Sequence, residues 1–171
     1  MRSGHLVGRC DRAGQVADYR NHSVKKPTKA ELLDRLRSHC REHELRVTPQ
    51  REAIYGELCC DGTHPTAEQL NARLRTRFPS LSLDTVNRTL LTFAEIGLID
   101  IVEGRGSPRR YDPDTESHHH AYCIRCGAIL DFQNARYDEL AVPAEVGRKF
   151  KITSKKVVLN GICTKCQRRA K

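Results

Sequence analysis

The sequence lacks the long apolar segments on which membrane proteins and secreted precursors depend. No run of about 18 consecutive apolar residues is present, so we expect no transmembrane helix. The opening residues MRSGHLVGRC also lack the apolar core of a secretory signal. These two absences predict a cytoplasmic protein that has no membrane partner.

The sequence also lacks the setting in which eight cysteines would form disulfides. Without an export signal, Cys-x-x-Cys spacing favours metal binding instead. Two such pairs are present, CIRC and CTKC, which supply Cys123, Cys126, Cys163 and Cys166. Four thiolates can close around one tetrahedral Zn²⁺ ion at about 2.3 Å per bond, which predicts one structural zinc per subunit. The other cysteines have no ligand spacing, so burial or chance is their default interpretation: Cys10, Cys40, Cys59 and Cys60.

Acidic residues are fewer than basic residues in this chain. Its 171 residues include 30 Lys and Arg against 21 Asp and Glu, which gives a formal net charge of +9 and a pI near 9.3. Such a balance favours a polyanionic partner, but a basic, well-hydrated surface explains it equally well. The length is sufficient for one sizeable domain or two small ones.

Signals for regular structure begin after residue 27. Residues 1–27 have no periodic apolar face, so we expect a flexible basic N-terminal arm, or a start codon placed too early. Four helix-start signals follow, each ahead of an apolar stripe: Thr28, Thr48 with Pro49, Thr66 and Ser82. LIDIVE and RRYD then predict two strands joined by a turn. Helices followed by a hairpin predict a winged helix-turn-helix DNA-binding domain over residues 28–112.

Residues 113–171 predict a smaller α/β domain. HHHAYCIRCGAILDF predicts two short strands separated by the first cysteine pair, and KITSKKVVLNGIC predicts a third strand before the second pair. Between them, Tyr137 to Phe150 has a helical pattern that Pro143 and Gly147 weaken. This is a thin core, for which a zinc clamp between strand ends would compensate. The chain as a whole is therefore expected to be α+β.

The helix that begins after Ser82 has an exposed face suited to DNA. Its apolar stripe leaves Thr85, Asn87, Arg88 and Thr92 on the open side. Asn and Arg pair bidentately with adenine and guanine edges. Nearby arginines suit phosphate contacts: Arg46, Arg51, Arg105, Arg109 and Arg110. Any one of these residues is better explained by a solvated surface helix, but as a set within a winged helix they predict contacts with double-stranded DNA.

Several motifs resemble the ferric uptake regulator family of metal-dependent repressors. The matching segments, in the family's order and at its spacings, are LRVTPQREAI, HPTAEQL, TVNRTL followed by GLI, RRYD, HHHAYCIRCG and CTKC. The resemblance runs from about Thr28 to Cys166. It implies a homodimer with two winged-helix domains on a DNA operator, a C-terminal dimerisation domain and a four-cysteine structural zinc. It implies a transcriptional repressor with no catalytic activity and no small-molecule substrate.

The resemblance further implies a regulatory metal, Fe²⁺ or Mn²⁺, at the hinge between the domains. Its ligands carry over to His64, Asp112, His118, His120 and Asp131. Residues 118 and 120 alternate on the expected strand, so both imidazoles face one side while His119 faces the other. Imidazoles with carboxylates suit Fe²⁺, Mn²⁺ or Zn²⁺, and ligands from both domains would favour one relative orientation of the two. The simpler alternatives are a helix-capping surface histidine at position 64 and an incidental polar strand at HHH.

Two departures from the family affect what binds. Many members carry tyrosine where this chain has Asn87, so the operator preference is open, and an adenine-reading Asn is a reasonable substitute. Some members build a further metal site at positions that are here Ser117, His119, Asp138 and Lys155. Because lysine is a poor ligand at neutral pH, we expect that site to be absent.

A third departure concerns the signal. Asp131 stands where iron-responsive members usually carry glutamate and the peroxide-responsive branch carries aspartate. That branch senses peroxide by iron-catalysed oxidation of ligand histidines, which here would be His64 and His118. We expect peroxide sensing first, iron sensing second and zinc sensing third.

Two functions of other classes stay open on the sequence. A zinc-dependent hydrolase could use His118, His120 and Asp131 as ligands with an open position for activated water. No HExxH-type arrangement supplies a general base beside the metal, and the winged helix would have no purpose. A zinc-ribbon module that binds protein is the other alternative, which salt-sensitive DNA binding dependent on Arg88 would exclude.

Overall fold

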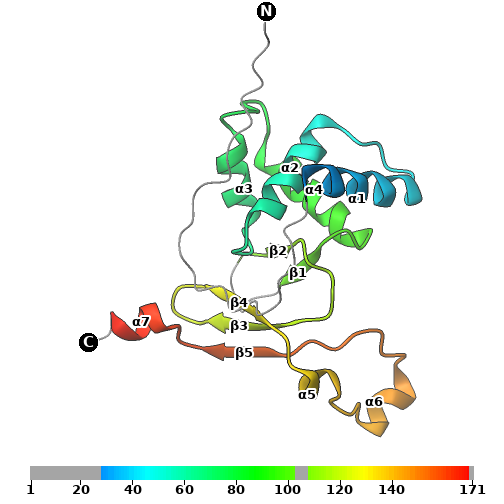
Figure 1. Cartoon of the computed structure of the whole chain (residues 1–171), viewed down its shortest axis with the longest axis vertical. Helices are drawn as coiled ribbons and strands as arrows, with labels where there is room; N and C mark the ends of the chain where they lie inside the picture. Colours follow the sequence, from blue (N-terminus) through cyan, green and yellow to red (C-terminus); the bar gives the residue numbers. More distant parts are fainter. Residues whose placement is uncertain (1–27, 103–107, 170–171) are drawn as a thin grey trace, which may run out of the picture.

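The structure, a computed structural model, describes residues 28–102 and 108–169. The expected basic arm at residues 1–27, with Cys10, and Arg105 in the wing lie outside the described residues. Within the described ranges, no helix is both long and apolar enough to cross a bilayer. Figure 1 shows a layer of helices and a small sheet with a hairpin between them. We call residues 28–112 the N-terminal unit and residues 113–169 the C-terminal unit.

Four helices of the N-terminal unit begin at the predicted caps. They are α1 Lys29–Glu42, α2 Pro49–Cys60, α3 Ala67–Leu74 and α4 Leu83–Glu95. The side chains of Thr28, Thr48, Thr66 and Ser82 each accept a hydrogen bond from a backbone N–H in the first turn. After α4 the chain turns through Gly97, whose φ of 70° costs glycine little.

A hairpin closes the N-terminal unit over a continuous apolar core. Strand β1 (Asp100–Val102) pairs antiparallel with β2 (Arg110–Asp112). Tyr111 from β2 is fully buried with side chains from all four helices, among them Leu36, Ile54, Leu70, Leu90 and Phe93. Burial of such side chains stabilises a fold by about 1.5–3 kcal/mol each. This core fixes the hairpin against the helices and confirms the winged-helix prediction.

The C-terminal unit is a three-stranded sheet with the order β4-β3-β5. Strand β3 (His119–Cys123) lies in the centre, antiparallel to β4 (Ile129–Phe132) and parallel to β5 (Val158–Gly161). Its buried apolar residues are few, namely Cys123, Ile129 and Cys166. The predicted thin core is therefore present, and the α+β class is confirmed.

Three predictions for the C-terminal unit differ from the structure in detail. The expected helix over Tyr137 to Phe150 is two short helices, α5 (Ala135–Asp138) and α6 (Ala144–Lys149), because Pro143 is the N-cap of α6 and cannot lie inside a helix. The third strand covers only residues 158–161 of the expected segment. A short helix, α7 (Thr164–Arg168), which the sequence pattern did not predict, carries Cys166.

Polar contacts join the two units. Lys156 donates to Asp100 of β1 at 2.6 Å, and Arg35 of α1 donates to the Thr115 hydroxyl at 2.8 Å. Arg110 of β2 donates to the carbonyl of Gly127, in the turn between β3 and β4, at 2.8 Å. The units are thus held side by side along the hairpin.

Candidate metal centres and nucleic-acid interface

The first candidate metal centre is formed by the four cysteines of the C-terminal unit. Cys123 ends β3, Cys126 follows in the turn, Cys163 caps α7 and Cys166 lies within it. Their sulfur atoms all lie within 4.8 Å of one another, and Cys126 Sγ is 3.6 Å from Cys163 Sγ. Four sulfurs bound to one Zn²⁺ at about 2.3 Å would lie about 3.8 Å apart in a tetrahedron. The cluster therefore has the dimensions of a closed zinc site.

The backbone around this cluster favours thiolate. The N–H of Cys163 donates to Cys123 Sγ at 3.3 Å. This hydrogen bond, with others from the turn, outweighs burial and lowers the pKa of Cys123 to about 6. Hydrogen bonding with Cys126 and burial raise the pKa of Cys166 to about 12, because the two sulfurs compete for charge. A divalent cation would relieve that competition, since it stabilises all four thiolates at once.

The second candidate centre draws on both units. It contains three histidines and two aspartates, contributed by the α2–α3 connection, the end of β2, the residue before β3, and strands β3 and β4: His64, Asp112, His118, His120 and Asp131. The sheet register pairs His120 directly with Asp131. His64 adopts a φ of 53°, a left-handed conformation that is uncommon outside glycine. The family resemblance implied that these five residues form one site, and the structure brings them together.

Five side-chain groups converge on one buried point. Asp112 Oδ2 lies 2.9 Å from His118 Nε2 and 3.1 Å from His64 Nε2. His118 Nε2 and His120 Nε2 are 2.9 Å apart. The three histidines and Asp112 are each no more than 3% exposed. The helix-capping surface histidine considered for position 64 is therefore wrong, because His64 is buried against carboxylates of both units.

The electrostatics of this His/Asp cluster favour a cation. Burial alone would lower the pKa of His64, but the hydrogen bond with Asp112 and the negative charge of Asp112 and Asp131 raise it to about 9. Hydrogen bonding to Asp112 likewise raises the pKa of His118. Burial would raise the pKa of Asp112, but hydrogen bonds from the three histidines hold it well below its usual range. Buried carboxylate charge thus attracts positive charge, whether protons on imidazole or a metal ion.

Two atoms of the cluster are incompletely satisfied, which fits a metal site. Asp131 Oδ1 lies 2.9 Å from His64 Nε2, yet this contact is not directed as a hydrogen bond. His64 Nδ1 is buried without a hydrogen-bond partner in the described residues. A buried acceptor aimed at a cluster of imidazole nitrogens is suited to coordination, which needs only that lone pairs converge. Nitrogen and carboxylate oxygen together match the preferences of Fe²⁺, Mn²⁺ and Zn²⁺.

His119 lies on the opposite face of β3, as the alternation predicts. Its ring is fully buried and packs 5.4 Å from Phe132 and from Tyr137. The other residues of the suggested further metal site are close by. Ser117 donates to Asp138 at 3.3 Å, and the Lys155 ammonium donates to the carbonyl oxygens of Asp138 and Leu140. The Lys155 side chain therefore lies among the residues of the suggested further metal site.

The exposed face of α4 is more constrained than the sequence indicated. Asn87 and Arg88 are exposed and Thr85 is half-buried. Arg88 forms an ion pair with Asp84 at 2.6 Å, and Thr85 Oγ1 is 2.8 Å from the Ser82 hydroxyl. Asn87 Oδ1 accepts a hydrogen bond from the Tyr111 hydroxyl at 3.0 Å. Sequence reasoning missed this last contact, because nothing in the spacing joins a residue of the hairpin to one on α4.

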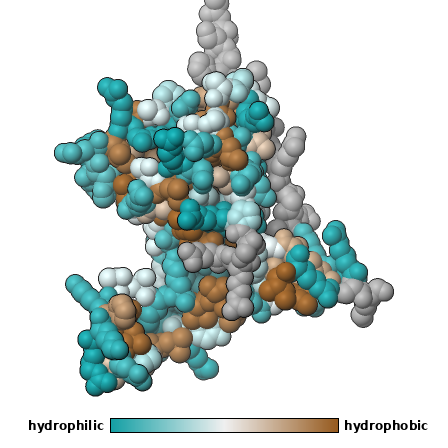
Figure 2. Space-filling model, turned by 180° about the vertical axis from the view of Figure 1, so that it is seen from behind, coloured by the Kyte–Doolittle hydropathy of each residue, from teal (hydrophilic) through white to brown (hydrophobic). Residues whose placement is uncertain are grey.

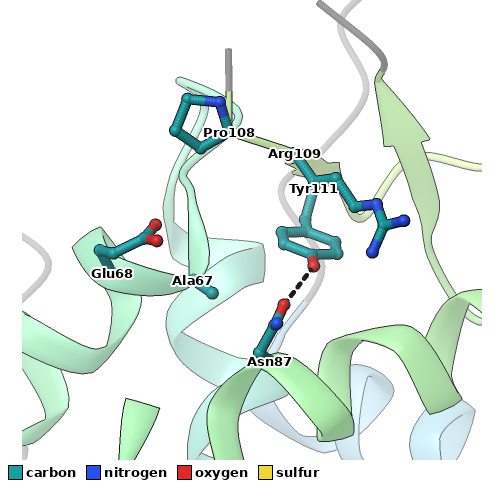
Figure 3. Close-up of a pocket in the computed structure, with 6 residues that line it drawn as sticks. All are labelled: Ala67, Glu68, Asn87, Pro108, Arg109 and Tyr111. Carbon is teal, nitrogen blue, oxygen red and sulfur yellow. Dashed lines mark hydrogen bonds between the residues drawn. The ribbon is translucent and has the colours of Figure 1, made fainter. Parts of the chain in front are cut away.

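The arginines predicted to contact phosphate differ in whether their side chains are hydrogen-bonded within the protein. Arg51 donates to the backbone carbonyl of Arg46 at 2.5 Å, which holds it at the start of α2. Arg110 donates internally, to Gly127 and to Gln69 at 3.3 Å, and its expected phosphate contact stays a prediction. Arg109 lines a hollow of about 200 Å³ between α3, α4 and β2. Figure 3 shows this hollow, with Asn87 and Tyr111 joined beside it.

Comparisons with known proteins agree with the motifs. The model of the ferric uptake regulator family matches residues 42–167. The peroxide-responsive repressor PerR of Staphylococcus aureus is 35% identical over 127 residues, which cover 74% of this chain and 86% of that protein.

Solved structures show the same fold. The ferric uptake regulator of Helicobacter pylori, described as having three functional metal-binding sites, superposes with a TM-score of 0.67 at 28% identity and covers 83% of this chain and 95% of its own. The peroxide stress regulator of Campylobacter jejuni gives a TM-score of 0.58 at 29% identity, with 80% and 99% covered. With a family model that spans most of its length and a relative at 35% identity, this chain belongs to the ferric uptake regulator family.

Proposed function

We propose that this chain is a metal-dependent transcriptional repressor, in which an ion held by the His/Asp cluster sets the orientation in which two winged helices bind an operator. The observation that carries the proposal is the composition of that cluster. His64 and Asp112 belong to the N-terminal unit, whereas His118, His120 and Asp131 belong to the C-terminal unit. A ligand that binds both units at once favours the relative orientation of the units in which all five side chains can reach it. Regulation of DNA affinity follows without any catalytic step.

In this proposal the four cysteines hold a structural Zn²⁺ ion and the His/Asp cluster holds Fe²⁺ or Mn²⁺. The cysteine sulfurs leave no ligand position open, which is typical of structural zinc. The His/Asp cluster offers mixed nitrogen and oxygen donors, which favour the harder divalent ions. The related proteins are regulators, and no observation on the described residues favours the hydrolase alternative.

We propose that the functional form is a homodimer that assembles through the C-terminal unit. Every residue from 138 to 156 is exposed in the single chain. This surface and the adjoining strand β5 include large apolar side chains that one chain leaves uncovered: Leu140, Val142, Val146, Phe150, Ile152, Val158 and Leu159. Figure 2 shows brown side chains scattered over the lower part of the molecule, which contains this unit. A second copy would cover them, and Phe150→Ser should shift the sedimentation coefficient from dimer towards monomer.

We propose hydrogen peroxide as the signal. Asp131 and the similarity to a peroxide-responsive repressor support this choice over an iron-responsive regulator, and zinc sensing is the third alternative. A bound Fe²⁺ ion would supply the one-electron chemistry by which peroxide oxidises a neighbouring imidazole. His64 and His118 both face Asp112 and are buried, so oxidation there would remove a ligand that joins the two units.

The test compares two metals in one protein. Zinc-containing dimer is loaded without oxygen with Fe²⁺ or Mn²⁺, and its binding to duplexes enriched from a random pool is measured before and after peroxide. Loss of binding with Fe²⁺ alone, with an added oxygen on the peptides of His64 or His118 but not on that of exposed His43, supports peroxide sensing. Equal insensitivity with both metals leaves an iron-responsive regulator. Equal affinity for every duplex, with and without metal, would exclude the repressor.

The DNA-binding face has its own test. Arg88→Ala on α4 should weaken binding and reduce its dependence on salt, since a neutralised phosphate or base contact is lost. Arg136→Ala, at an exposed arginine on α5 outside the proposed dimer surface, should leave both unchanged. The remaining proposed contacts are Thr85, Asn87 and Arg51, with Arg105 from the wing.

A further inference from the structure

Strand β2 connects the His/Asp cluster to helix α4 through two adjacent residues that face opposite ways. Asp112 enters the cluster, and Tyr111 faces the helices of the N-terminal unit, as alternation along a strand requires. Tyr111 is fully buried, and its backbone N–H donates to the carbonyl of Pro65, next to His64, at 3.1 Å. The ring is therefore fixed by packing and by the backbone. Its hydroxyl reaches the α4 surface at Asn87.

The hydrogen bond from Tyr111 fixes which way the Asn87 amide points. The hydroxyl donates to Oδ1 at 3.0 Å, so the amide nitrogen occupies the other branch of the side chain. Turning the amide over would take the acceptor away from the hydroxyl of a buried residue, which is unfavourable. Asn87 itself is exposed, and Figure 3 shows its amide beside the hollow between α3, α4 and β2. The Asn87 oxygen is thus hydrogen-bonded to Tyr111, and its amide nitrogen has N–H groups available to donate.

This arrangement changes what Asn87 can recognise. An asparagine reads adenine by accepting from N6 and donating to N7, which uses its oxygen and its nitrogen together. Here the oxygen is turned towards Tyr111, whose hydroxyl takes one of its two lone pairs, so the amide nitrogen is the group left to meet a base. In the major groove, guanine offers acceptors at N7 and O6 and thymine offers one at O4, whereas adenine and cytosine place an amino donor at the corresponding position. Both purines offer N7, so the amide N–H groups discriminate at the neighbouring position: they meet a second acceptor, O6, on guanine but an amino donor on adenine, and an acceptor on thymine but an amino donor on cytosine.

We propose that Tyr111 is a positioning residue that makes Asn87 a hydrogen-bond donor, so that α4 selects a keto base, guanine or thymine, where Asn87 meets the operator. The adenine preference suggested by the residue type alone is replaced by this one. The inference rests on the proposed function as a DNA-binding repressor, and adds to it the identity of a specificity pair. A single hydrogen bond of this kind gives about a five- to tenfold preference between matched and mismatched bases.

The experiment works without a known operator sequence. Full-length dimer containing zinc and loaded with Mn²⁺ selects duplexes from a random pool, in parallel with Asn87→Ala, Asn87→Asp and Tyr111→Phe. Asn87→Ala identifies the position in each half-site that depends on this side chain. The expected result is guanine or thymine at that position for the unsubstituted protein. Tyr111→Phe keeps the ring and frees the oxygen, so adenine should rise about five- to tenfold there and nowhere else.

Asn87→Asp provides a second route that leaves the buried ring intact. A carboxylate only accepts hydrogen bonds, so the preference at the same position should move to adenine or cytosine, whose amino groups donate. Tyr55→Phe is the matched control, because it removes another hydroxyl from the core of the same unit, and it should alter no position. A merely structural role for Tyr111 would weaken binding at all positions together.

The outcomes separate the inference from the function on which it rests. Adenine at the Asn87-dependent position in the unsubstituted protein, no position that depends on Asn87, or a keto preference that persists in both Tyr111→Phe and Asn87→Asp would overturn the inference and leave the repressor in place. Failure of the unsubstituted protein to enrich any sequence with Mn²⁺ would instead overturn the proposed function.

Discussion

The two metal-binding clusters differ in what they join. The four cysteines come from one unit and connect its small sheet to a short helix, α7. The His/Asp cluster joins the hairpin and the α2–α3 connection of one unit to the sheet of the other. The cysteine cluster is partly exposed at Cys126, whereas the three histidines are buried. A metal in the first cluster would therefore stabilise a fold, and a metal in the second would select an arrangement of units that are already folded.

The largest effect is expected from breaking the cysteine cluster. Cys163→Ser should release zinc and unfold the C-terminal unit, because few apolar residues are buried there. A structural zinc contributes about 10–16 kcal/mol in small zinc-binding peptides. The zinc content of Cys163→Ser and its thermal unfolding, followed by circular dichroism, test this prediction. Cys60→Ser, at an exposed cysteine outside the cluster, should retain both, and retention of zinc by Cys163→Ser would contradict the assignment.

Breaking the His/Asp cluster should leave the fold intact and remove the coupling. His118→Ala deletes the imidazole that lies 2.9 Å from both Asp112 and His120. Mn²⁺ should then fail to strengthen DNA binding, a loss of about 5–150-fold for a typical coupling of two sites. The zinc content should stay at one per chain. The matched control is exposed His43→Ala, and a parallel loss of zinc in His118→Ala would show that the two clusters are not independent.

The contrast between the clusters also explains what the sequence could predict. Helix starts were found because caps such as Thr28 and Thr66 act locally, through side chains within three residues. The cysteine pairs were found because their spacing is local too. The His/Asp set came only through the family motifs, since no local rule relates His64 to Asp131 across the two units.

The features missed are set by tertiary contacts or by very short segments. Helix α7 has five residues, too few for a periodic apolar pattern. Arg110 was expected on phosphate because exposed arginines in a wing usually face solvent, but the neighbouring turn offers it the carbonyl of Gly127. The pairing of Tyr111 with Asn87 depends on how the hairpin lies over α4. Each of these depends on how elements distant in sequence meet.

A smaller effect is expected from breaking a contact that holds the two units together. Arg110→Met removes the hydrogen bonds to Gly127 and Gln69, so the apo protein should sample other orientations of its units more often. The apparent affinity for Mn²⁺ should fall about fivefold, the value of the one hydrogen bond, to Gly127, that crosses between the units. Titration calorimetry on the zinc-containing dimer measures this. Arg109→Met, which changes the neighbouring arginine on the hollow, should leave Mn²⁺ affinity unchanged. If Arg109→Met and Arg110→Met lower the affinity equally, the cause is the loss of positive charge from the wing.

The smallest effect should come from Lys156 and Asp100, whose ion pair links the units at 2.6 Å but keeps about a third of each side chain exposed, 32% and 35%. Exposed pairs contribute about 0–1 kcal/mol, so Lys156→Met should weaken Mn²⁺ binding by no more than about fivefold at low salt. The effect should fade near 1 M salt, where the Debye length falls to about 3 Å. Lys29→Met, at an exposed lysine of α1 outside the proposed dimer surface, controls for loss of positive charge. If adding Asp100→Asn to Lys156→Met weakens Mn²⁺ binding no further, the ion pair itself is the source of the effect. Additive effects at all salt concentrations would show instead that the hairpin is held to the sheet by contacts other than charge.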